Sequence, residues 1–146
     1  MQVDLDDRKP ERREKPYDLD TFRVMIIEDS TFIASLLSST LSEMGVGSIT
    51  TANNIAAAKE KLLNFNAVQS SQNIDVLIVD WLMPDGDGGE FISWLRKHRS
   101  DPIKFVPVIV CSAYASTELV EERRDVGANE EMVKPASAEK LATRLL

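Results

Sequence analysis

Four short apolar runs each end in residues that an apolar core does not accommodate, and segments of helical spacing separate the runs. The runs and the polar residues after them are VMII with Glu28-Asp29, VLIV with Asp80, VIVC with Ser112, and Met132-Val133 with Lys134-Pro135. In a parallel α/β sheet the carboxyl ends of the strands share one edge, and ligand sites form at that edge. The sequence therefore predicts that three carboxylates, a hydroxyl and an ammonium group meet in one shallow site.

Such a collection of charges predicts both a metal ion and a substrate. Carboxylates held this close repel one another strongly unless a cation lies among them. Oxygen-rich acidic sites suit a hard divalent ion, which makes Mg²⁺ the expected cofactor. The hydroxyl and the ammonium group suit the oxygens of a phosphoryl group, so the site is typical of phosphoryl transfer.

The alternation of strands and helices predicts the fold. We expect strands near residues 22–27, 49–52, 74–79, 105–111 and 131–133, each followed by a helical segment. This pattern predicts right-handed crossovers and a flavodoxin-like α/β fold, a doubly wound five-stranded parallel sheet of order 2-1-3-4-5 with five helices. The switch point of that order lies between the first and third strands, which places Asp29 and Asp80 on either side of one crevice.

Composition limits the classes of function. The net charge of −7 and the pI near 4.8 argue against a nucleic-acid-binding surface. The apolar runs are too short to span a membrane and no apolar signal core is visible, so we expect a cytoplasmic protein. Residues 1–20 carry many charges and few apolar side chains, which predicts a flexible tail before one domain over residues 21–146. Cys111 lies within an apolar run, where a small buried hydrophobe is a better interpretation than a redox thiol.

From about Phe22 to the C-terminus the chain resembles the response-regulator receiver domain, the CheY-like phosphoacceptor module of two-component signalling. The resemblance rests on five motifs in order, Glu28-Asp29, Asp80-Trp-Leu-Met-Pro, Asp87-Gly88, Ser112-Ala113 and Lys134-Pro135. It implies a signalling protein rather than an enzyme. A histidine kinase or a histidine phosphotransfer protein would phosphorylate Asp80 and so switch a face that binds a downstream protein target. The resemblance leaves open whether two copies form a homodimer.

The resemblance also implies a role for each acidic residue. Asp80 is the expected nucleophile, whose carboxylate would form an acyl phosphate. Asp29 would bind Mg²⁺ directly and Glu28 through a water molecule, because Mg²⁺ keeps part of its hydration shell. The main-chain carbonyl of Leu82 would be a further metal ligand. A simpler alternative for the acidic pair is the N-cap of the following helix, for which Asp29 or Ser30 is available.

Three further residues are expected near the phosphoryl group. By the resemblance, Lys134 would pair with the phosphoryl oxygens. Pro135 would be a cis-proline that turns the chain and aims Lys134 inward. Ser112 occupies the switch position, from which its hydroxyl would donate to a phosphoryl oxygen.

The chain departs from the receiver pattern in its fifth strand. Receivers commonly carry Tyr or Phe three residues before the lysine, and here that position is Glu131. Tyr114, two residues after Ser112, is the candidate for a relocated aromatic switch. Leu82 and Tyr114 would flank the water that hydrolyses an aspartyl phosphate. Because neither side chain can orient that water and both are bulky, we expect slow loss of phosphate.

Two other functions are compatible with the sequence. Asp85-Gly86-Asp87-Gly88 resembles the Asp-x-Asp-Gly motif of haloacid-dehalogenase-type phosphatases, although Asp85 lies five residues past Asp80. A turn into the third helix, with Asp87 near the N-cap, is the better interpretation of this motif. The second alternative is a degenerate scaffold that binds partners without phosphorylation. The intact Asp29, Asp80 and Lys134 argue against it.

Overall fold

One five-stranded parallel sheet forms the centre of the computed structural model, which describes residues 19–68, 73–112 and 117–133. Its strands are β1 (Arg23–Ile27), β2 (Ser48–Ala52), β3 (Val76–Asp80), β6 (Val108–Ser112) and β7 (Glu130–Val133). The order within the sheet is β2-β1-β3-β6-β7. Numbered along the chain, these five strands have the order 2-1-3-4-5, which confirms the predicted flavodoxin-like sheet.

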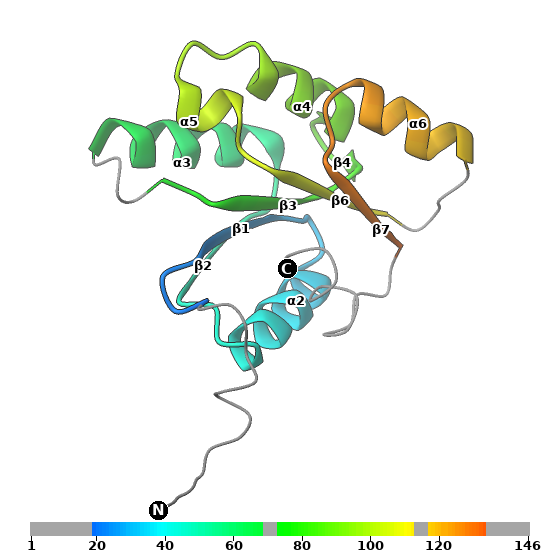
Figure 1. The fold of residues 1–146 in the computed structure, drawn as a ribbon. Helices are drawn as coiled ribbons and strands as arrows, with labels where there is room; N and C mark the ends of the chain where they lie inside the picture. Colours follow the sequence, from blue (N-terminus) through cyan, green and yellow to red (C-terminus); the bar gives the residue numbers. More distant parts are fainter. Residues whose placement is uncertain (1–18, 69–72, 113–116, 134–146) are drawn as a thin grey trace, which may run out of the picture.

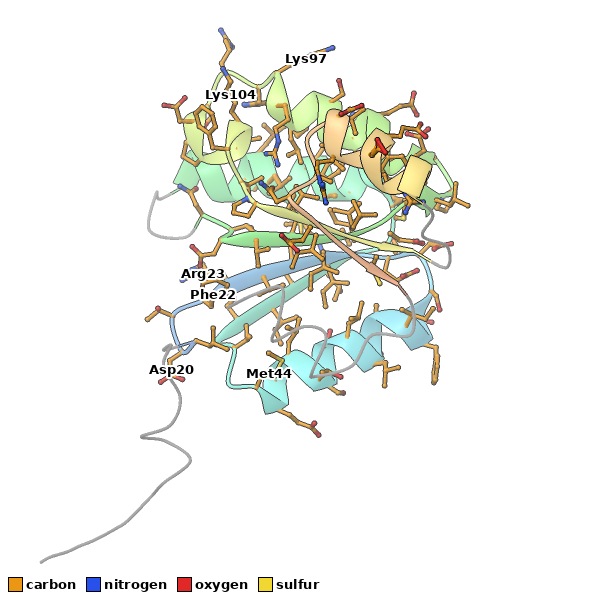
Figure 2. All side chains as sticks on the ribbon, turned by 45° about the vertical axis from the view of Figure 1, so that its right-hand side comes forward. Asp20, Phe22, Arg23, Met44, Lys97 and Lys104 are labelled. Atoms are coloured by element: carbon orange, nitrogen blue, oxygen red, sulfur yellow. The ribbon has the colours of Figure 1, made fainter. Side chains whose placement is uncertain are left out.

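Helices cover both faces of the sheet (Figure 1). One face carries α2 (Thr31–Glu43), and the other carries α3 (Ile55–Val68), α4 (Gly88–Arg96), α5 (Asp101–Lys104) and α6 (Thr117–Asp125). Figure 2 shows these layers with Met44 next to the end of α2, and with Lys97 and Lys104 on the opposite layer. Residues 1–18 of the predicted tail and the helical segment expected after the fifth strand lie outside the described residues. None of the helices in the described ranges is long and apolar enough to cross a membrane.

Alternate residues of the central strands pack on opposite faces of the sheet. In β1, Val24 and Ile26 join the buried cluster beneath α2, whereas Met25 and Ile27 join the cluster beneath α3 and α4. Every residue of β3 is buried, as expected for a strand that helices cover on both faces. Cys111 is buried in the cluster beneath α2, which confirms its interpretation as a small hydrophobe.

The segment before β6 differs from the prediction. We expected a strand from residue 105, but α5 ends at Lys104 and β6 begins only at Val108. Ile103 and Val106 are each 3% exposed while Phe105 is 67% exposed, so burial here follows the spacing of a helical turn rather than strand alternation. Pro102 favours this turn because its fixed φ suits the start of a helix.

Two other element ends differ by one or two residues. The strand β3 begins at Val76 and ends at Asp80, so Asp80 is the last strand residue rather than the first residue after the strand. The helix α4 ends at Arg96, and His98 follows it. There the His98 Nδ1 accepts a hydrogen bond from the N–H of Ser100 at 3.0 Å.

Candidate functional site

The strand register brings the ends of β1 and β3 together. Ile27 of β1 lies opposite Val79 of β3, so Glu28 and Asp80 follow at the same level of the sheet. This pairing crosses the switch point between the first and third long strands, where ligand sites of doubly wound sheets form. The predicted meeting of the acidic residues at this edge therefore has its structural basis in the parallel ladder.

Glu28, Asp29 and Asp80 form an acidic cluster in which one carboxylate oxygen from each residue lies within 4.8 Å of the others. Glu28 is 4% exposed and Asp80 is 9% exposed, whereas Asp29 is open to solvent. Two like unit charges about 4 Å apart repel by about 4 kcal/mol at the effective dielectric constant of a protein surface. A cation bound among these oxygens would remove that repulsion.

Local hydrogen bonds hold the loop that carries Glu28 and Asp29. The N–H of Glu28 donates to the carbonyl of Ala52 at 3.0 Å, and Glu28 Oε2 accepts from the N–H of Ser30 at 3.2 Å. Ser30 is the N-cap of α2, because its Oγ accepts from the N–H of Ile33 at 3.3 Å. Of the two residues available as caps, Ser30 has this role, and the Asp29 carboxylate lies in the acidic cluster instead.

A small hairpin follows Asp80. Its two short strands, β4 (Leu82–Met83) and β5 (Gly86–Asp87), pair antiparallel. Asp87 is the N-cap of α4 and forms a capping box with Glu90, since each side chain accepts from the other residue's N–H. The predicted turn into the third helix with Asp87 at its cap is therefore confirmed.

Asp85 caps a helix from a distant part of the chain. Its two carboxylate oxygens accept from the N–H groups of Ile55 and Ala56 at the start of α3, each at 3.0 Å. These two hydrogen bonds hold the pKa of the Asp85 carboxyl below its usual value of 3.8, and the bond from Ile55 has the larger effect. The hairpin is thereby connected to α3, an arrangement that sequence motifs do not reveal because the two partners are 30 residues apart.

This cap predicts a pH-dependent contribution to stability. A carboxyl with a lowered folded-state pKa stabilises the fold above its unfolded pKa, and loses that contribution as the pH falls through the folded pKa. We therefore expect Asp85→Asn to be less stable than the parent near neutral pH, with the difference shrinking as the pH falls below 3.8. Urea unfolding at a series of pH values measures this, with Glu60→Gln on the exposed face of α3 as the control. A difference that grows toward low pH would contradict the assignment.

Two pockets adjoin the acidic cluster. One has a volume of about 470 Å³ and is lined by Asp29, Asn53, Asn54, Ala56, Pro84 and Asp85. The other has a volume of about 290 Å³ and includes Glu28 and Lys61 in its lining. The ammonium group of Lys61 donates to the carbonyl of Thr51 in the same lining. A substrate can therefore approach the cluster from the side of Asp29.

Comparison with known proteins places this architecture in a family. Residues 24–146 match the sequence profile of the response regulator receiver domain, a range that includes the acidic cluster and all of the parallel sheet except Arg23. The chain belongs to the response regulator receiver domain family.

The relatives of this receiver domain differ in how much of their length it covers. It is 32% identical over 123 residues to the transcriptional regulatory protein KdpE of Staphylococcus aureus, a match that covers 84% of this chain but 48% of KdpE. It therefore spans about half the length of that relative. The chemotaxis protein CheY1 of Helicobacter pylori is 27% identical over 124 residues, covering 84% of this chain and 93% of CheY1.

Solved receiver structures have the same fold. The chemotaxis response regulator CheY4 of Vibrio cholerae superposes with a TM-score of 0.71 at 30% identity, covering 85% of this chain and 95% of that one. A chain of the CheX–CheY–BeF3–Mg complex from Borrelia burgdorferi gives a TM-score of 0.74 at 30% identity, with 85% and 86% of the two chains covered.

Several residues expected around the phosphoryl group of the receiver domain lie outside the described residues. Ser112 ends β6 and pairs in register with Val133, the last residue of β7. Lys134 is next in the chain after Val133, but Lys134, Pro135 and Tyr114 all fall outside the described ranges. Their roles in this receiver domain stay predictions.

The two remaining predicted positions lie in described strands. Leu82, whose main-chain carbonyl we expect to bind metal, is in β4 and its side chain is 72% exposed. Glu131, which replaces the usual aromatic residue of receivers, lies in β7 opposite Val110 of β6. Their metal-binding and switching roles stay predictions.

Two arginines of the receiver domain have contacts that sequence patterns do not reveal. The Arg96 guanidinium bonds four acceptors, the carbonyls of Gly127, Lys104 and Val106 and the Asn129 Oδ1. Arg123 is 4% exposed, and its guanidinium carbon lies 4.7 Å from the centroid of the Trp81 ring. In the sequence both residues appear as ordinary helical charges, and their partners come from other elements.

Proposed function

We propose that this receiver domain accepts a phosphoryl group on Asp80 from the phosphohistidine of a histidine kinase or of a histidine phosphotransfer protein, in a Mg²⁺-dependent reaction. The observation that carries the proposal is the acidic cluster, in which an aspartate ending a fully buried strand lies within 4.8 Å of two further carboxylates. In this role the chain is a phosphoacceptor in a signalling relay, and its own modification is the signal.

The Asp80 carboxylate is the nucleophile of the transfer. One of its oxygens forms a bond to phosphorus while the bond from phosphorus to the donor imidazole nitrogen breaks, and that nitrogen keeps the electron pair and takes up a proton. The product is an acyl phosphate on Asp80. Burial of β3 holds the backbone of Asp80 in place, so the nucleophile is positioned before a donor arrives. We assign the hydroxyl of Ser112 and the ammonium of Lys134 to the phosphoryl oxygens.

The acidic cluster fits Mg²⁺ by the chemistry of its donors. Three carboxylates offer hard oxygen ligands at mutual distances that one ion can bridge. When bound, Mg²⁺ would neutralise charge on the carboxylates and on the phosphoryl oxygens. We propose Asp29 and Asp80 as direct ligands, Glu28 as a ligand through water, and the main-chain carbonyl of Leu82 as a further ligand.

A related protein supports this proposal, and the hairpin argues against the phosphatase alternative. A chain that is 30% identical to this one comes from the CheX–CheY–BeF3–Mg complex of Borrelia burgdorferi. The carboxylates that a phosphatase of the haloacid-dehalogenase type would use are Asp85 and Asp87. Each of them accepts a helix N-terminal N–H in the described structure, which favours a capping role for both.

The proposed output is a change of the face formed by α6, β7 and the C-terminal segment, to which a downstream protein binds. Tyr114 would take the aromatic switch role in place of Glu131, and Pro135 would orient Lys134 toward the site. We further propose that residues 21–146 are the functional unit, that residues 1–20 are a flexible tail, and that the protein acts in the cytoplasm.

Acetyl phosphate provides a direct test of phosphorylation. We expect one phosphoryl adduct per chain when the protein is incubated with acetyl phosphate and Mg²⁺, because the small donor needs no partner protein. Intact-mass measurement detects the adduct, and chelation of Mg²⁺ beforehand should prevent it. A folded protein that gains no adduct would favour the scaffold alternative, and continuous release of phosphate without an adduct would favour the phosphatase.

Substitutions of Asp29 and Lys134 should distinguish the residue that binds the metal from the residue that contacts the phosphoryl group. We expect Asp29→Ala to weaken Mg²⁺ binding at least about tenfold, because it removes a side chain that binds the ion directly. Lys134→Ala should leave Mg²⁺ affinity nearly unchanged, since an ammonium group is not a metal ligand. Isothermal titration calorimetry measures both variants against the parent. Equal losses of Mg²⁺ affinity in the two variants would contradict the separate roles.

A further inference from the structure

We propose that Arg123 couples the chemical state of Asp80 to helix α6 through the indole ring of Trp81. This inference rests on the proposed phosphorylation of Asp80, and it adds the physical link by which that event reaches α6. Both views show α6 beside α4 on the same face of the sheet (Figures 1 and 2). The two helices are thus neighbours at the end of the sheet where the chain leaves β3.

Arg123 is buried although it belongs to a strongly charged helix. The described neighbours of Arg123 in α6, Glu121, Glu122, Arg124 and Asp125, are exposed, whereas Arg123 is only 4% exposed. Arginine is seldom buried to this degree, because removing a guanidinium from water costs free energy that surrounding groups must offset. The position of this cation is therefore set by the groups that surround it inside the fold.

The aromatic ring beneath Arg123 belongs to the residue next to Asp80. The Arg123 guanidinium carbon lies 4.7 Å from the centroid of the Trp81 ring, a distance at which a cation and the face of an indole attract each other. Trp81 shares a peptide bond with Asp80 and leads directly into the hairpin. A shift of the backbone at Asp80 therefore also moves Trp81, the next residue, and with it the ring that contacts the Arg123 guanidinium.

Trp81 is also tightly packed against the start of α4. A Cβ atom on Gly88 would lie 3.1 Å from Trp81 Cε3, and one on Gly89 would lie 3.2 Å from Trp81 Cη2, so a side chain at either position would press on the ring. The N–H of Gly88 donates to the Trp81 carbonyl at 2.6 Å. Because this packing leaves little room toward α4, a displacement of the indole changes its contact with Arg123.

Phosphorylation would change the charge and the position of groups at Asp80. An added phosphoryl group brings negative charge to the residue that precedes Trp81, and its contacts draw on the same chain segment that holds Trp81. Coupling of this kind travels through contiguous packed groups, and here the contiguous groups are Asp80, Trp81 and Arg123. Helix α6 carries Arg123, so α6 is the element whose stability and position should respond.

Hydrogen exchange of the α6 amides, residues 117–125, tests the coupling. The parent protein is measured with and without acetyl phosphate and Mg²⁺, beside Arg123→Met, Arg123→Ala and the matched control Arg124→Met on the exposed side of the helix. We expect all four proteins to acquire the adduct by intact mass. The exchange of α6 should change on phosphorylation in the parent and in Arg124→Met, and this change should be lost in both Arg123 variants.

The Arg123→Met variant keeps an unbranched apolar stem that can pack as the arginine stem does. It therefore allows the test even if Arg123→Ala does not fold. The coupling is overturned if the α6 response persists in a folded Arg123 variant, if Arg124→Met loses it as well, or if the phosphorylated parent shows no α6 response. In a Trp94→Phe background, where Trp81 is the single tryptophan, Arg123→Met should shift the emission and Arg124→Met should not.

Failure of the proposed phosphorylation gives a different result. The parent would then gain no adduct, and Asp80→Asn becomes the perturbation in place of the phosphoryl group. The coupling then predicts that Asp80→Asn changes α6 exchange when Arg123 is present and leaves it unchanged in the Arg123→Met background. An equal effect of Asp80→Asn in both backgrounds would overturn the coupling by itself.

Discussion

Asp80→Asn is expected to take up no phosphoryl group from acetyl phosphate in the presence of Mg²⁺, whereas the parent gains one. The amide oxygen is a poor nucleophile and carries no charge, so the substitution removes both the attacking group and one proposed metal ligand. Intact-mass measurement after equal incubation compares the two proteins. The expected effect is complete loss, which makes this the most decisive of the substitutions.

Matched controls are available in the same segment. Asp85→Asn and Asp87→Asn make the same isosteric change at carboxylates that cap α3 and α4, and both should keep the adduct. Asp80→Asn should also be at least as stable as the parent without Mg²⁺, because it removes one of three like charges within 4.8 Å. An adduct that survives in Asp80→Asn would remove Asp80 from the central role.

Arg96→Ala is expected to have the largest effect on stability, lowering the free energy of unfolding by about 2–3 kcal/mol. Two guanidinium nitrogens, Nε at 3.2 Å and Nη2 at 2.8 Å, donate to the Gly127 carbonyl. Nη1 donates to the carbonyls of Lys104 at 2.9 Å and Val106 at 2.7 Å, and Nη2 also donates to Asn129 Oδ1 at 3.0 Å. Truncation removes every one of these bonds and leaves carbonyls that water can only partly satisfy.

Urea unfolding measures this effect, and the neighbouring lysine provides its control. Lys97 is exposed on the same helix end, so Lys97→Ala should change the free energy of unfolding by less than about 0.5 kcal/mol. Arg96→Lys should recover only part of the loss, because an ammonium group lacks the planar fork that reaches several acceptors at once. Similar stabilities for Arg96→Ala and Lys97→Ala would show that the bonds contribute little.

The order of the sheet and the acidic cluster follow from local patterns in the chain. The continuous apolar run that ends at Asp80 is typical of a strand buried on both faces, and β3 is such a strand. Parallel pairing then puts the residues after Ile27 and Val79 at the same edge of the sheet, and this does not depend on side chains elsewhere in the chain. Glu28, Asp29 and Asp80 could thus be predicted together, because their meeting depends on strand ends and topology alone.

Segments without a clear period were predicted less well. The stretch 98–107 has apolar residues at positions compatible with a strand or a short helical turn, and only packing of Ile103 and Val106 into the core selects α5. Because of the same ambiguity, the sequence predicts a strand from residue 105, whereas β6 begins at Val108. Local propensity is weak in such short segments, and burial against the rest of the fold determines the outcome.

Contacts between distant side chains and backbone groups depend on the assembled fold. Asp85 caps α3 because the hairpin brings its carboxylate to Ile55, and Arg96 reaches Gly127 because α4 lies beside the turn after α6. Arg123 and Trp81 likewise come from two elements that only the packed helices bring together. A periodic pattern records which face of an element is buried, and from it the strands, their order and the acidic edge can be inferred. It does not record which partner a charged side chain meets, because that depends on the relative positions of elements far apart in the chain.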